Sequence, residues 1–252
     1  MKRQLIYTAA ILSAVVGALA GYRYFTGTYL PEKRLSDAAE EQQKLIDAVR
    51  PETVNINESN DEHTTDPLAP VREVNDDTVG WIYIPGTNID LPIVQGEDNE
   101  LYLHNGFNGQ YNYELGCPFL DNRCSKDMSG FNSIVYAHNI EGRKMFADIA
   151  LFRESGFISE HSKGTLTLPD GSHEVDFFAY LPVQSDSAAY HTFFIDSREQ
   201  NEYISYLFSA SSYTQTYSEK DLLEMENIHI LLLSTCTFEN KNARGILAGI
   251  IN

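Results

Sequence analysis

The spacing of apolar residues changes twice along the chain. Leu5 to Tyr22 is rich in Leu, Ile, Val and Ala and has no charged residue, a length at the lower edge of a bilayer-spanning helix. From residue 31 to 50 the apolar residues follow helical spacing, and Pro51 ends that pattern. From Val79 onward, short apolar runs are separated by turn residues, which predicts strands.

The C-terminal two thirds of the chain contain many short strand patterns and few helical ones. This balance predicts a mainly β fold, a closed or nearly closed β-barrel rather than a parallel α/β sheet. A helix is expected over 197–208, started by Asp196 with Glu199 three residues later. Shorter helices are expected over 142–152 and after Ser218. The predicted strands cover residues 80–85, 89–94, 119–121, 133–137, 165–168, 175–183, 230–233 and 243–251.

Three regions follow from this pattern. Residues 1–25 are predicted to be a signal-anchor helix, 26–78 a helix and an acidic linker, and 79–252 the barrel. Lys2 and Arg3 predict a cytoplasmic N-terminus, so the expected location is the cell membrane, single-pass, with the barrel domain extracellular. A cleaved signal peptide is the competing interpretation, because residues 18–20 have the small-x-small form of a cleavage site.

Charge and cysteine content narrow the classes of function. The net charge of −18 over 252 residues argues against a basic nucleic-acid-binding surface. Residues 53–77 are acidic and poor in large apolar residues, which is typical of a solvated linker. Three cysteines are too few for a disulfide framework. Cys117 and Cys124 could pair in an exported chain, which would leave Cys236 free.

Candidate chemistry begins at the end of the apolar run Ile230–Leu233, which stops at Ser234-Thr235-Cys236. A cysteine at the end of a core strand is held by a rigid scaffold and can still face a cleft, as a nucleophile must. The alternative is a packing cysteine, since cysteine is among the most often buried residue types.

Two further residues bear on that choice. The polar turn 239–242 predicts a hairpin whose return strand starts near Arg244, which would place a guanidinium beside the thiol. His138 ends another apolar strand, and imidazole both accepts and returns protons near neutral pH. The competing interpretations are a surface ion pair for Arg244 and a strand-end histidine bonded to a backbone carbonyl for His138.

Together these residues resemble a known family. The run 233–236, with His138 after an apolar strand and Arg244 on the next strand, is similar to the sortases, the cysteine transpeptidases of Gram-positive cell walls. Stretches from Val79 onward narrow the resemblance to class B. They are Gly80-Trp81-Ile82, residues 88–96, Asp98-Asn99 with Tyr102-Leu103, Phe107-Asn108-Gly109, and Gly116 with Phe119 and Asp121.

The resemblance implies an eight-stranded barrel with helical insertions and an N-terminal helical extension, in line with the strand pattern. It also implies roles at the site. Cys236 would attack a C-terminal sorting motif of exported proteins and form a thioester, and His138 would carry the proton. Arg244 would stabilise the oxyanion, and Ser234 would face the substrate groove. An amine of a peptidoglycan precursor would then receive the acyl group.

The chemistry implied needs neither a cofactor nor a metal ion, so none is expected. Several alternatives remain open from the sequence: a pilin-polymerising sortase that uses a lysine amine, a hydrolytic thiol peptidase, and a catalytically silent membrane-anchored binding module on the same barrel. The sequence does not define the sorting motif or the cargo protein.

Overall fold

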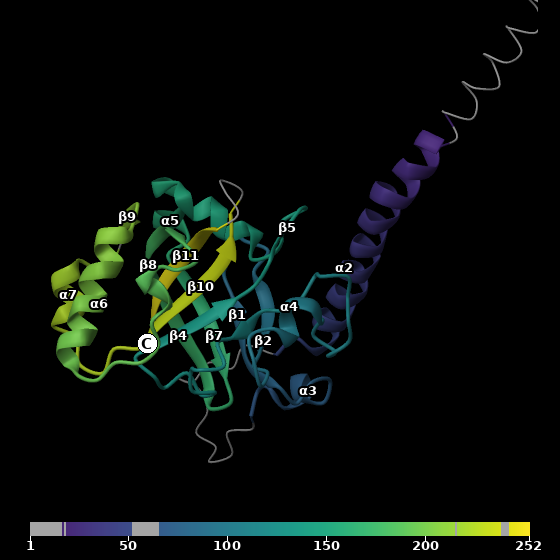
Figure 1. The fold of residues 1–252 in the computed structure, drawn as a ribbon. Helices are drawn as coiled ribbons and strands as arrows, with labels where there is room; N and C mark the ends of the chain where they lie inside the picture. Colours follow the sequence, from purple (N-terminus) through teal and green to yellow (C-terminus); the bar gives the residue numbers. More distant parts are fainter. Residues whose placement is uncertain (1–16, 18, 52–65, 215, 238–241) are drawn as a thin grey trace, which may run out of the picture.

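The computed structural model describes residues 17, 19–51, 66–214, 216–237 and 242–252. In this part of the chain, eight strands build a barrel: β1 (Thr78–Tyr83), β2 (Asp90–Val94), β3 (Phe119–Leu120), β4 (Asn132–Tyr136), β7 (Lys163–Leu168), β8 (Gly171–Gln184), β10 (Ile230–Cys236) and β11 (Ala243–Ile251). Their order is β11-β10-β4-β3-β2-β1-β7-β8, and pairing of β8 with β11 closes the sheet (Figure 1). The predicted closed eight-stranded barrel is confirmed.

The three remaining strands are short. β9 (Tyr213–Thr214) extends the sheet from β8, and β5 (Asn139–Ile140) pairs with β6 (Lys144–Met145) in a separate hairpin. β5 begins directly after His138, so the hairpin leaves the barrel at the candidate site. Closing the main sheet through β8 and β11 pairs the backbone groups that an open sheet would leave at its two edges.

β10 lies between β4 and β11 and is buried on both faces. It runs parallel to β4 and antiparallel to β11. Leu231 and Leu233 belong to the apolar cluster that fills the barrel, whereas Ile230 and Leu232 belong to a second cluster outside it. Because successive strand side chains point to opposite faces, a strand with two buried faces has a continuous apolar sequence.

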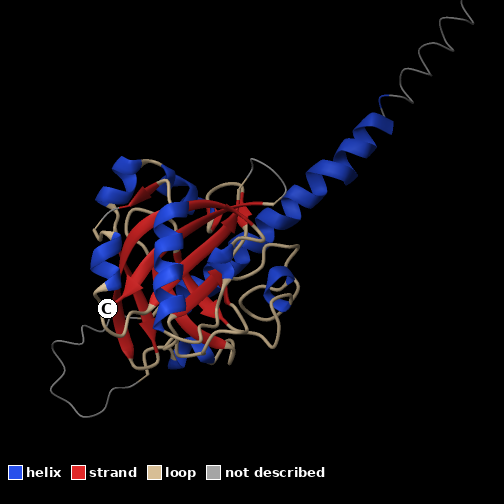
Figure 2. Cartoon of the chain, turned by 60° about the vertical axis from the view of Figure 1, so that its left-hand side comes forward, coloured by secondary structure: helices blue, strands red, loops and turns tan. Residues whose placement is uncertain are grey.

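The second cluster lies beneath the helical insertion between β8 and β10. α6 (Ser197–Ala210) and α7 (Glu219–Leu223) cover this outer face of the strands (Figures 1 and 2). α6 begins as predicted, because the Asp196 carboxylate accepts a hydrogen bond of 3.0 Å from the backbone N–H of Glu199. The predicted helix after Ser218 is confirmed as α7, which starts with a capping box between Ser218 and Asp221.

The predicted amphipathic helix of the N-terminal region is confirmed as α2 (Leu30–Val49), which follows a π-helical turn, Phe25–Tyr29. One end of α2 lies against the barrel beside α4 (Leu101–His104), and the other end projects away (Figure 1). Its buried residues are Ala39, Gln42 and Ile46. These are three and four positions apart, so they share one face of the helix.

The prediction of a single-pass anchor, with its location at the cell membrane, is corrected by the structure. Within the described residues, we find no helix with both the length and the apolar character needed to cross a membrane. Residues 1–16 and 18, which make up most of the predicted anchor, lie outside the described residues.

Two local predictions differ from the structure. Residues 142–152 do not form one helix: they hold β6 and the start of a 3₁₀ helix, Ala147–Arg153. Residues 66–77, predicted as part of a solvated linker, pack on the barrel through α3 (Ala69–Arg72), with Leu68 and Val71 fully buried. Leu68 and Val71 belong to the main core cluster, so this acidic segment is docked on the barrel rather than solvated. Residues 52–65 lie outside the described residues.

Candidate active site

The site lies where the outer face of three neighbouring strands changes from apolar to polar. On β10 the residues of this face are Ile230 and Leu232, followed by Ser234 and Cys236. On β11 the apolar residues 246, 248 and 250 share the face of Arg244. On β4 the same alternation leads from residue 134 through 136 to His138. The period of two therefore brings all four predicted site residues to one face at one end of the barrel.

Cys236 is the last residue of β10, and its side chain is exposed. All three cysteines are free, so Cys117 and Cys124 do not pair. Cys117 is buried, and burial raises its pKa far above the ordinary value of a thiol. Burial also raises the pKa of Cys124 to about 11. Because the thiolate is the reactive form, Cys236 is the thiol best placed to react.

Arg244 is the direct cross-strand partner of Cys236 in the antiparallel pairing of β10 with β11. Such partners have Cβ atoms roughly 4.5–5.5 Å apart. Arg244 is half-buried, and its Nη1 donates a hydrogen bond of 3.0 Å to the backbone carbonyl of Ala243. The register thus places a permanent positive charge beside the thiol.

His138 and Cys236 occupy matching positions on neighbouring strands. His138 lies two residues after Tyr136, the end of β4, and Cys236 lies two residues after Ser234. Ser234 is the parallel partner of Tyr136, and the contact continues past the ladder, because the Asn139 side-chain amide donates to the carbonyl of Cys236 at 3.0 Å. His138 Nε2 lies 2.8 Å from the carbonyl oxygen of Leu103. A carbonyl only accepts, so Nε2 carries a proton and Nδ1 is the basic nitrogen of the neutral ring.

Ser234 is buried, and its hydroxyl lies 2.9 Å from that of Tyr190. Tyr190 belongs to the 3₁₀ helix Ala188–Tyr190, in the insertion that follows β8. Burial raises the pKa of Tyr190 above its ordinary value, so the phenol keeps its proton. Tyr190 was not predicted from the sequence, because nothing in the local pattern connects it with Ser234.

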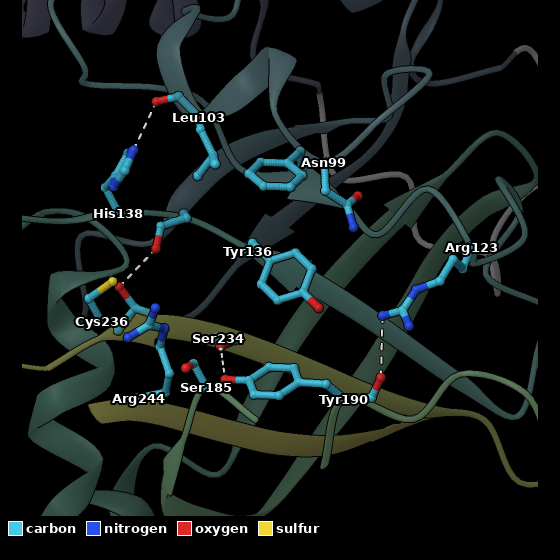
Figure 3. Close-up of a pocket in the computed structure, with 13 residues that line it drawn as sticks. Asn99, Leu103, Arg123, Tyr136, His138, Ser185, Tyr190, Ser234, Cys236 and Arg244 are labelled. Carbon is cyan, nitrogen blue, oxygen red and sulfur yellow. Dashed lines mark hydrogen bonds between the residues drawn. The ribbon is translucent and has the colours of Figure 1, made fainter. Parts of the chain in front are cut away.

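The four predicted site residues and Tyr190 line one cavity of about 360 Å³ (Figure 3). His138, Cys236 and Arg244 lie at one end, and Arg123 lies at the other. Aromatic rings form much of the wall between the two ends: Phe119, Tyr136 and Tyr190, with Tyr136 stacked on Tyr190 at 5.9 Å between ring centroids. The groove therefore has an aromatic, largely apolar wall between two polar ends, the mixture of apolar lining and few polar groups that is typical of binding sites.

Comparison with known proteins shows what the chain is similar to. No family model matches the chain. The sequence is 27% identical to sortase B of Listeria monocytogenes over 247 residues, which is 97% of this chain and 96% of the relative. The chain is thus similar to a class B sortase over nearly its whole length. The family consists of cysteine transpeptidases, which agrees with one exposed thiol at the mouth of the groove.

Solved structures of class B sortases have the same fold. Sortase B of Clostridium perfringens aligns with a TM-score of 0.65 and 27% identity, over 72% of this chain and 97% of that one. A class B sortase of Streptococcus pyogenes involved in pilus biogenesis aligns with a TM-score of 0.64 and 27% identity, over 72% and 96%. Nearly the whole of each sortase domain is thus matched by this chain.

The far end of the groove is held by a buried carboxylate that the sequence did not single out as a site residue. Asp121 is fully buried and accepts hydrogen bonds from Arg123 at 2.6 and 2.8 Å and from the Tyr136 hydroxyl at 2.9 Å. Burial alone would raise the pKa of Asp121, but the bonds from Arg123 and Tyr136 outweigh it and hold the pKa below its usual value. The pair therefore stays charged and fixes the Tyr136 ring in the wall.

Across the described ranges of the chain, no three His, Cys, Asp or Glu side chains gather closely enough to hold a metal ion. Of the other histidines, His104 pairs with Glu114, and His161 Nδ1 lies 3.0 Å from the carbonyl of Pro85. His63 lies outside the described residues.

Proposed function

We propose that the chain is a transpeptidase that cleaves a C-terminal sorting motif, forms a thioester on Cys236 and transfers the acyl group to an amine of a peptidoglycan precursor. The observation that carries the proposal is the pairing of Cys236 with Arg244 on the strand face that also holds His138. Nucleophile, cation and proton carrier then meet at one end of a peptide-sized groove.

In the first half-reaction, His138 Nδ1 takes the thiol proton, and the thiolate sulfur of Cys236 attacks the carbonyl carbon of the scissile amide. The Arg244 guanidinium binds the oxyanion that forms, because it offers several N–H donors in one plane. When the C–N bond breaks, the leaving amine takes the proton from His138, and a thioester remains. The Nε2–H···O=C bond to Leu103 keeps the ring oriented through both proton transfers.

In the second half-reaction, the acceptor amine attacks the thioester carbon and gives its proton to His138 Nδ1. The C–S bond breaks, the sulfur leaves as the thiolate, and the proton returns to it from His138. One amide is exchanged for another, so no energy carrier is consumed. Ser234 and Tyr190 line the groove beside the nucleophile, where their hydroxyls are placed to bind the backbone of the motif.

A second candidate keeps the same site and changes the acceptor. The similarity to a Streptococcus pyogenes class B sortase involved in pilus biogenesis favours, as the alternative, a lysine amine of a pilin. The chemistry at Cys236 is identical in the two cases. The nucleophile that resolves the thioester is the difference between them.

Incubation of the full chain with a library of sorting-type peptides tests the proposal. Intact-protein mass spectrometry should show an acyl adduct on Cys236, and Cys236→Ala should form none. Adding oligoglycine, peptidoglycan stem-peptide amines or a lysine peptide then identifies the acceptor from the product formed. Peptide turnover retained in Cys236→Ala would rule out the thioester route, and an adduct resolved only by water would indicate a hydrolase.

A further inference from the structure

Gln42 is a buried amide on the face of helix α2 that packs against the barrel domain. Its exposed fraction is 7%. A buried amide destabilises a fold unless its polar atoms are bonded, and those of Gln42 are. The side-chain oxygen accepts from the backbone N–H of Phe107 at 3.0 Å and from the Asn112 amide at 2.9 Å, and the side-chain nitrogen donates to the carbonyl of Gly116 at 3.1 Å.

These partners belong to one loop, residues 105–116, which returns the chain from α4 to the barrel. Asn112 joins the same network, because its side-chain oxygen accepts from the backbone N–H of Gly116 at 3.0 Å. Gln42 therefore joins the start of the loop at Phe107 to its end at Gly116. A neighbour on the helix, Gln43, is exposed and bonds only along the helix, to Asp47 at 2.8 Å.

The end of this loop packs directly against the candidate proton carrier. Gly116 has φ +68°, and a Cβ placed there would lie 3.0 Å from His138 Cδ2, 2.8 Å from the carbonyl oxygen of Tyr102 and 3.1 Å from that of Leu103. The Leu103 carbonyl is the acceptor for His138 Nε2. The loop thus touches both the imidazole ring and the group that orients it.

We propose that Gln42 is a positioning residue for His138: through the 105–116 loop, the N-terminal helix α2 holds the imidazole and the Leu103 carbonyl in the geometry that proton transfer needs. This inference rests on the proposed role of His138. It means that α2 supports the active site indirectly, through the loop, although no residue of α2 lines the groove.

If Gln42 only stabilised the docking of α2, its loss should have the same effect as the loss of an apolar docking residue. The buried apolar side chains that dock α2 are Ala39 and Ile46, which belong to the main core cluster, and the partly buried Leu35, Leu45 and Val49 pack against that cluster. Loss of one of these side chains should weaken docking and lower the melting temperature without a specific effect on the imidazole. Loss of the Gln42 amide should act first on the loop and on the orientation of His138.

The test uses the full chain with four variants. Gln42→Leu removes the bonds at constant size, and Gln42→Glu keeps the acceptor for Phe107 and loses the donor to Gly116. Gln43→Leu is the matched control on the same helix, and Ile46→Ala is the control for docking. The readouts are kcat and KM for acyl transfer, the melting temperature, and the His138 tautomer by NMR of histidine-labelled protein.

Gln42→Leu should lose roughly 100-fold in kcat, the order expected for a displacement of about 1 Å at a catalytic group, with little change in KM. Its His138 ring should populate both neutral tautomers, whereas the wild type keeps Nε2–H. The kcat of Gln42→Glu should lie between those of the wild type and Gln42→Leu. Gln43→Leu should match the wild type in every readout. Ile46→Ala should have a lower melting temperature but retain a single His138 tautomer.

Wild-type kcat and a single tautomer in Gln42→Leu would overturn the proposal. The same would follow if Ile46→Ala, at an equal loss of melting temperature, changed kcat and tautomer as much as Gln42→Leu. Failure of the proposed function has a different signature, because the wild type would then transfer no acyl group to any amine. The tautomer readout needs no substrate and decides the role of Gln42 in that case too.

Discussion

Cys236 and Arg244 are directly opposed partners in the antiparallel register of β10 with β11. The backbone ladder, rather than the connecting turn, sets the position of the guanidinium beside the thiol. Because side chains alternate between the faces of a strand, a slip of one residue would turn Arg244 into the barrel. The register is held by buried side chains on alternate faces of β11: Leu247 faces one cluster, and Ile246, Ala248 and Ile250 face the other.

Replacement of the Arg244 guanidinium should impair the chemical step. Arg244→Ala should lower kcat by roughly 10²–10³, the loss typical of removing an oxyanion donor. Arg244→Lys should retain only part of the wild-type kcat, because an ammonium group keeps the positive charge but lacks the planar fork of N–H donors. Steady-state kinetics measure both, and Arg198→Lys, at an exposed side chain of α6, is the control. Full activity in Arg244→Ala would show that the oxyanion is stabilised by another group.

The three cysteines should differ sharply in reactivity. Native protein treated with iodoacetamide near pH 8 should be alkylated first at Cys236, because burial raises the pKa values of Cys117 and Cys124 and blocks access. Peptide mapping by mass spectrometry after timed quenching gives the order. In urea all three thiols should react at comparable rates. Faster labelling of Cys124 than of Cys236 in the native protein would contradict the assignment.

The hydroxyl pair of Ser234 and Tyr190 should contribute to binding of the peptide substrate. Ser234→Ala and Tyr190→Phe should each raise KM with a small effect on kcat, because the pair lines the groove and is not in line for proton transfer. The two losses should be coupled by about 1 kcal/mol in a double-mutant cycle, as expected for one shared hydrogen bond. Strictly additive effects would mean that the two hydroxyls act separately.

Asp121 should stabilise the fold in a pH-dependent way. Its pKa is lowered in the folded state, so its contribution is complete above the unfolded value of about 3.9 and is lost as pH falls through the lower folded value. Asp121→Asn should reduce the free energy of unfolding by about 2–3 kcal/mol at pH 7. Urea unfolding at pH 7 and pH 3 measures the difference, which should shrink at the lower pH.

The exposed Asp186, for which the same substitution should have little effect, is the control for that experiment. A difference between wild type and Asp121→Asn that stays equal at the two pH values would contradict the role given to the carboxylate charge. Such a result would point to a loss of packing rather than of ion pairing with Arg123.

Gly116 and Gly109 form a matched pair for the loop beside His138. Both have left-handed backbone, with φ +68° and +74°, but a Cβ would meet three close neighbours at Gly116 and open space at Gly109. Gly109→Ala should lose about 1 kcal/mol of stability from backbone strain alone. Gly116→Ala should lose more and should also reduce kcat, because the methyl group displaces His138 or the carbonyl groups of α4. Equal effects on kcat would exclude steric coupling to the imidazole.

The local sequence pattern was sufficient to predict an element wherever interactions between neighbouring residues determine its structure. The apolar run before Ser234, the hairpin to Arg244 and the Asp196 helix start could all be predicted from neighbouring residues, and each is present. Residues 142–152 were predicted less well, because the β5–β6 hairpin and a 3₁₀ helix compete there with the helical spacing of Ile149 and Phe152. Burial of both residues is satisfied by either arrangement.

By itself, the sequence determined a barrel of short strands and a cysteine at the end of a buried strand, since short apolar runs separated by turn residues are local patterns. Only the tertiary structure decided which distant groups build the site around that cysteine. The parallel pairing of β4 with β10 brings His138 alongside, the insertion after β8 supplies Tyr190, and α2 delivers Gln42. These contacts arise from burial shared between segments far apart in the chain, which leaves no periodic signal in either segment.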